Sequence, residues 1–91
     1  MSRPTGNTPF PQRARSLAMR QYGGPVTKAT DPIPVHVWLL SVDGEETEVQ
    51  GMALAWTPRA VHVRYIDRHQ REDSAWVWAG AVRRTQPEKA H

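Results

Sequence analysis

The sequence predicts an all-β fold, a small barrel of five short antiparallel strands, and three observations point to this class. Short runs of alternating apolar and polar residues recur after residue 33. Residues 51–82 hold three of the four tryptophans together with six β-branched residues. Asp43-Gly44, a strong short hairpin signal, separates two of the runs. We therefore divide the 91 residues into a basic N-terminal arm at 1–32, a barrel at 33–84 and a disordered tail at 85–91.

The arm contains one candidate helix, at residues 9–22. Thr8-Pro9 resembles a helix start, and Gly23-Gly24-Pro25 provides stop signals. Apolar residues recur between them at helical spacing, namely Phe10, Ala14, Leu17, Ala18 and Tyr22. A helix this short is marginal alone, so it either orders on nucleic acid or a partner, packs on the open end of the barrel, or stays a disordered tail. Residues 26–34, rich in proline, are expected to form an extended linker.

The first two strands flank the Asp43-Gly44 turn. Residues 35–41 form the first strand, and its mixed alternation suggests that both faces are covered. The second strand begins at residues 45–49. In a regular strand the side chains of Val49 and Met52 would point to opposite faces of the sheet. A bulge or bend at Gly51 is therefore expected to turn both towards the core.

The next hairpin spans residues 52–65 and has an internal check on its register. A two-residue Pro58-Arg59 loop, with proline at a position typical of a type I turn, pairs Trp56 with Val61. The same register pairs Leu54 with Val63 and Met52 with Tyr65. Directly paired residues share a face, so these six large side chains are expected to form the core face.

The loop at residues 67–73 leaves the facing of the next strand open. An even loop pairs Val61 with Trp76 and directs Trp76 and Trp78 into the core. An odd loop instead buries Ala75, Val77 and Ala79 and turns both tryptophans outwards. Beyond it, Ala79-Gly80-Ala81 indicates a tight turn before a short last strand at residues 82–84.

The stretch Trp76-Val77-Trp78-Ala79-Gly80-Ala81-Val82-Arg83 resembles the end of the SH3-like small barrel. In that superfold a strand passes through one 3₁₀ turn and continues as the fifth strand. The resemblance covers about residues 33–84. Bacterial and chromatin-type members of this superfold bind nucleic acid, other proteins or modified tails, so the resemblance leaves the function open. Trp78 stands about where a proline is usual, and the acidic and aromatic motif of PxxP-binding members is absent. No peptide-binding residues are carried over.

The composition and motifs of the chain argue against several classes of function. The chain has no cysteine and therefore no thiolate site or disulfide, which fits a cytoplasmic protein. No apolar run approaches the ~20 residues of a membrane span, and no secretion signal is evident. The histidines lack metal-ligand spacing, and the serines, threonines and carboxylates lack catalytic partners. We expect no enzyme, no metal, no cofactor and no small-molecule substrate. The alanine- and arginine-rich composition is associated with a bacterial or bacteriophage source.

The leading functional prediction is a module that binds nucleic acid or belongs to a nucleoprotein assembly. The net charge of +3 comes from the arm, which suits phosphate contacts, and exposed tryptophans can stack on bases. The alternative is a protein-interaction or assembly subunit that docks through exposed tryptophans and the helix. The oligomeric state is left open. The candidate binding residues are Arg13, Arg15, Arg20, Trp38, Arg59, Arg64, Arg68, Trp76, Trp78 and Arg83.

Overall fold

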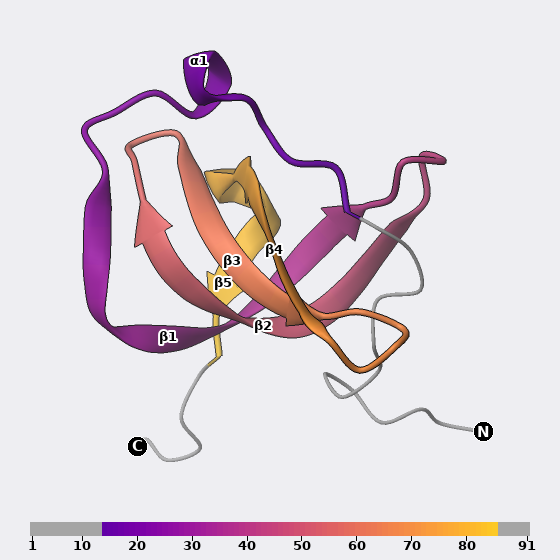
Figure 1. The fold of residues 1–91 in the computed structure, drawn as a ribbon. Coiled ribbons are helices and arrows are strands. Elements are labelled where there is room, and N and C mark those ends of the chain that lie inside the picture. The colour runs from indigo at the N-terminus through magenta and orange to yellow at the C-terminus, as the bar shows by residue number, and fades with distance from the viewer. Residues whose placement is uncertain (1–13, 86–91) are drawn as a thin grey trace.

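A computed structural model describes residues 14–85 as one antiparallel sheet of five strands in the order β4-β3-β2-β1-β5. The sheet curves around a single core (Figure 1). This confirms the predicted class, a small all-β, barrel-like domain. The strands are β1 (Thr27–Leu40), β2 (Glu46–Trp56), β3 (Ala60–Ile66), β4 (Glu72–Trp78) and β5 (Val82–Arg84), with one helical turn α1 (Met19–Tyr22) and one 3₁₀ turn η1 (Ala79–Ala81).

β1 begins eight residues before the first strand that the sequence predicts. The linker prediction for residues 26–34 is therefore wrong, because β1 pairs with β2 from Thr27 onwards. The pairing is interrupted between Lys28 and Ile33, and Pro32 lies inside that interruption. Proline has no N–H to donate to a ladder, so the irregular step tolerates it. The turn at Asp43-Gly44 forms as predicted, with φ +94° at Gly44 and its N–H donating to the Ser41 carbonyl.

The predicted β2–β3 hairpin is correct at its turn and wrong further along. Thr57 and Ala60 close the two-residue Pro58-Arg59 loop, and Trp56 pairs with Val61. The register then shifts between Ala53 and Ala55, which leaves Leu54 as an extra residue in β2.

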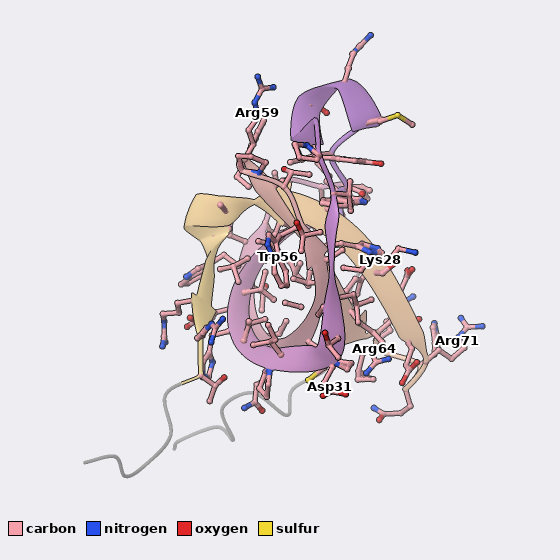
Figure 2. All side chains as sticks on the ribbon, turned by 90° about the vertical axis from the view of Figure 1, so that its left-hand side faces the viewer. Lys28, Asp31, Trp56, Arg59, Arg64 and Arg71 are labelled. Carbon is pink, nitrogen blue, oxygen red and sulfur yellow. The ribbon has the colours of Figure 1, made fainter. Side chains whose placement is uncertain are left out.

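This shift changes which residues of β2 face the core. Val63 and Tyr65 are buried as predicted, but their neighbours in β2 are the small residues Ala53 and Ala55. The predicted core residues Met52, Leu54 and Trp56 are only half-buried, as is Val61. Trp56 is labelled in Figure 2.

Gly51 shows why β2 needs small residues on its inner side. The predicted bulge at Gly51 is absent, and Val49, Gly51 and Ala53 alternate regularly towards the core. A Cβ added at Gly51 would lie 2.7 Å from the carbonyl oxygen of Arg64 on β3. The two strands therefore approach too closely for any larger residue.

β4 adopts the odd register, with Val61 opposite Val77 and Val63 opposite Ala75. Ala75 and Val77 are buried, so Trp76 and Trp78 face away from the core. Ala79, which this register was also expected to bury, is exposed because the strand ends at Trp78 and η1 begins there. The predicted turn and last strand are confirmed as η1 and β5. The amide of Ala79 donates to the Arg59 carbonyl at 2.8 Å, which ties η1 to the β2–β3 turn.

The N-terminal arm differs most from the structure that the sequence predicts. The helix prediction for residues 9–22 is wrong from Ala14 to Ala18, and only α1 is helical; residues 9–13 lie outside the described part of the chain. Ala14 forms a β-bridge with Ser41, and the Arg15 amide donates to the Leu40 carbonyl at 2.7 Å. The Leu17 amide donates to the Trp76 carbonyl at 2.9 Å. Residues 14–22, which we call the strap, therefore connect β1 to β4 and close the barrel.

Replacing Gly51 with alanine is expected to destabilise the domain. The added methyl group overlaps backbone rather than a flexible side chain, so the strands must separate, at a cost of about 1–3 kcal/mol. In a domain of this size that lowers the thermal midpoint by roughly 4–24 °C. The control is Gly80→Ala, whose Cβ meets no atom within 4 Å. Equal midpoints for the two variants in a thermal melt would contradict the close β2–β3 approach.

Candidate functional site: a tryptophan groove at the barrel seam

Three of the four tryptophans line one groove of about 420 Å³, where the strap, β1, β4 and η1 meet. Trp38 comes from β1, and Trp76 and Trp78 come from β4. We call this the tryptophan groove. Its remaining lining residues are Arg15, Ser16, Leu17, Gln21, Leu40, Glu46, Val77 and Ala81.

The odd register of β4, which positions two of the tryptophans, is associated with a compact turn at residues 67–71. The Asp67 carboxylate accepts hydrogen bonds from the amides of His69 and Arg71 at 2.8 and 2.9 Å. Gln70 adopts φ +65°, and the Arg71 carbonyl accepts from the Asp67 amide. The Arg71 amide, assisted by the His69 amide and the positive charge of Arg71, lowers the pKa of Asp67. This five-residue turn gives the pairing that directs Trp76 and Trp78 outwards.

Trp76 holds the strap. Its amide donates to the Ser16 hydroxyl at 2.9 Å, and its carbonyl accepts from Leu17. Its ring stacks between two others, with centroids 3.8 Å from Tyr22 and 5.1 Å from His62. Thr57 fixes the far end of the strap, because its hydroxyl donates to the Tyr22 carbonyl at 2.6 Å. Trp76 is therefore mainly a structural wall of the groove.

Trp38 and Trp78 remain available to a ligand. Their exposed fractions are 48% and 49%, the largest among the tryptophans. Both stand on the outward side of strands whose inward residues, such as Leu39 and Val77, already fill the core. Neither indole is needed to complete the core.

The predicted arginines do not gather on one face. Arg15 lines the groove and donates to the Val42 carbonyl at 3.2 Å, while Arg20 is exposed on α1. Arg59 lies at the α1 end of the molecule and Arg64 at the other (Figure 2). Arg68 contacts His69 in the β3–β4 turn.

Two of the predicted binding arginines are ion-paired. Arg83 lies 3.3 Å from the Glu48 carboxylate. Arg64 lies 4.0 Å from Glu72. Arg13 lies outside the described residues.

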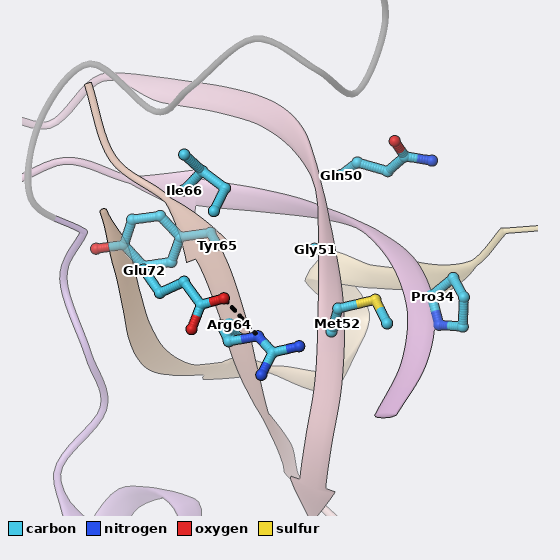
Figure 3. Close-up of a pocket in the computed structure, with 8 residues that line it drawn as sticks. All are labelled: Pro34, Gln50, Gly51, Met52, Arg64, Tyr65, Ile66 and Glu72. Atoms are coloured by element: carbon cyan, nitrogen blue, oxygen red, sulfur yellow. Dashed lines mark ion pairs between the residues drawn. The ribbon is translucent and has the colours of Figure 1, made fainter. Parts of the chain in front are cut away.

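A second, shallower hollow of about 360 Å³ contains the Arg64–Glu72 pair (Figure 3). Met52 and Ile66 line it beside the pair, and Tyr65 is its only aromatic residue. Within residues 14–85, no group of three or more histidines and carboxylates could hold a metal ion. No helix in that same range is long and apolar enough to cross a membrane.

Sequence reasoning missed the residues that hold the strap, namely Ser16, Leu17, Tyr22 and Thr57. The only available signal was Thr57-Pro58, since a threonine hydroxyl commonly caps a following turn. Here it accepts hydrogen bonds from the amides of Arg59 and Ala60, both at 3.1 Å. Comparisons of the chain with protein-family models, with curated proteins and with solved structures find no match.

The stack of Tyr22, Trp76 and His62 predicts that the stability of the folded domain depends on pH. Burial lowers the pKa of His62 below its ordinary value of 6.5. The unfolded chain therefore binds this proton at higher pH than the folded chain. The contribution of His62 is complete above about pH 6.5 and declines as the pH falls towards its lower folded pKa.

We expect the thermal midpoint to fall between about pH 7.5 and about pH 5.5, and His62→Gln to reduce that fall. His69→Gln is the matched control, because His69 is exposed in the β3–β4 turn. It should retain the wild-type dependence. An unchanged pH dependence in His62→Gln would show that the stack does not disfavour the proton.

Proposed function

We propose that the protein is a noncatalytic protein-interaction module whose tryptophan groove holds an extended segment of a partner protein. The observation that carries this proposal is the gathering of Trp38, Trp76 and Trp78 in one groove, two of them half-exposed. We also infer that the barrel is SH3-like. The strand order and the 3₁₀ turn between β4 and β5 support that resemblance.

The exposed indoles supply the affinity in this proposal. Half of a tryptophan surface is on the order of 100 Å², and its burial is worth roughly 2–3 kcal/mol at about 25 cal/mol per Å². Two such residues lining one groove match the composition of binding hot spots. Burying both in a complex would offset much of the entropy lost on association.

The charges favour a protein partner over nucleic acid. Residues 14–85 contain nine basic and eight acidic side chains, so the barrel is nearly neutral. The groove itself combines Arg15 with Glu46, and a carboxylate beside the indoles repels phosphate. The geometry thus supports the protein-interaction alternative more than the nucleic-acid prediction. Cytoplasmic location and a bacterial or bacteriophage source stay predictions from composition.

Peptide display on the full chain tests the groove. Peptides selected on the wild type should bind at least tenfold more weakly to Trp38→Ala and Trp78→Ala, because each variant removes a half-exposed indole. Ile66→Ala is the matched control, since Ile66 is exposed and lies outside the groove. It should bind the selected peptides as the wild type does. Folding of each variant is checked by circular dichroism.

The same protein is titrated with duplex and single-stranded oligonucleotides at low and high salt. Binding that falls steeply with salt and survives in Trp78→Ala would favour a phosphate-binding function. Failure to select any peptide sensitive to Trp38→Ala and Trp78→Ala would contradict the proposed function.

A further inference from the structure

We propose that the partner segment is residues 8–13 of a second copy, so that two chains exchange their N-terminal segments between their tryptophan grooves. This inference rests on the proposed function, because it names an occupant for the same groove.

The chemistry of the segment matches the groove. Its sequence is Thr-Pro-Phe-Pro-Gln-Arg, with Phe10 between Pro9 and Pro11. Proline fixes its own φ and disfavours the helical region for the residue before it, so such a segment favours extended conformations. A stiff extended segment loses little conformational entropy on docking, and proline-containing segments commonly dock in aromatic-lined grooves.

The charges are complementary as well. Glu46 lines the groove, and the adjoining β1–β2 turn adds Asp43 and Glu45. The ion pairs within residues 14–85 use other carboxylates. Arg13 ends the proposed segment and brings a guanidinium to this acidic side, where Arg15 offers the only positive charge in the groove lining.

The attachment point of the segment favours exchange between copies. Ala14 is held by its bridge to Ser41 and by its amide, which donates to the Tyr65 hydroxyl at 3.2 Å. From Ala14 the strap runs into the groove wall at Arg15, Ser16 and Leu17. To enter its own groove, a segment attached at Ala14 would have to reverse direction there, which the bridge to Ser41 opposes. Exchange between two copies gives each segment a groove in a closed twofold arrangement.

Sedimentation of the full chain over a range of concentrations tests the exchange. The wild type and the control Ile66→Ala, which lies outside both the segment and the groove, should form dimers. Phe10→Ala, which removes the apolar anchor, and Trp78→Ala, which removes its receptor, should each raise the dimer dissociation constant at least tenfold. If Trp78→Ala lowers the thermal midpoint, Trp38→Ala replaces it as the groove variant.

A mixture of the two variants gives the sharper result. Phe10→Ala keeps an intact groove and Trp78→Ala keeps an intact segment, so an equimolar mixture recovers one of the two exchanged contacts. Its mean mass should exceed that of either variant alone. A monomeric wild type at every concentration, a Phe10→Ala dimer as tight as the wild type, or no gain on mixing would overturn the exchange.

The peptide experiment separates this failure from failure of the proposed function. If the groove binds selected peptides but Phe10→Ala changes nothing, the groove takes a foreign partner and the exchange is wrong. If the groove also binds no selected peptide, both proposals are wrong.

Discussion

The packing of the strap against Trp76 is the interaction on which the rest of the structure depends. The edge strands of the sheet are β4 and β5. An unpaired edge exposes backbone N–H and C=O groups that can pair with another chain. The strap covers part of β4 by bonding to both the amide and the carbonyl of Trp76. The Tyr22 ring then covers the indole. The residues that complete the barrel thus also build one wall of the tryptophan groove.

Small residues inside the barrel explain why large ones are outside. Gly51 lets β2 lie close to the β3 backbone, Ala53 and Ala55 are buried beside it, and the core is filled mainly by valine, alanine, Leu39 and Tyr65. Such a core has no space for several indoles. Trp38 and Trp78 therefore stay half-exposed, at a hydrophobic cost that burial against another surface would remove. This is the physical basis for treating the groove as a docking surface.

Local signals in the sequence predicted the turns, while long-range pairing decided the features that the sequence left open or predicted wrongly. Asp43-Gly44, Pro58-Arg59 and the 3₁₀ turn form as expected, because each depends on few neighbouring residues. The prediction of which β2 side chains face the core was wrong. The extra residue Leu54 shifts the pairing by one position, so the opposite set of side chains points inwards. The helix predicted at residues 9–22 was wrong from Ala14 to Ala18, because the amides of Arg15 and Leu17 pair with Leu40 and Trp76 rather than within a helix. For the site, sequence identified the tryptophans, but the distribution of arginines depends on the fold.

The central claim is that residues 14–22 belong to the barrel rather than to a free arm, and amide hydrogen exchange under native conditions tests it most directly. The amides of Arg15 and Leu17 donate to Leu40 and Trp76 across the seam, so they should exchange at least about a hundredfold more slowly than in an unstructured chain. Ser16→Ala should accelerate exchange at Trp76, whose amide loses its acceptor. Exchange of Arg15 and Leu17 at the rates of an unstructured chain would contradict the account.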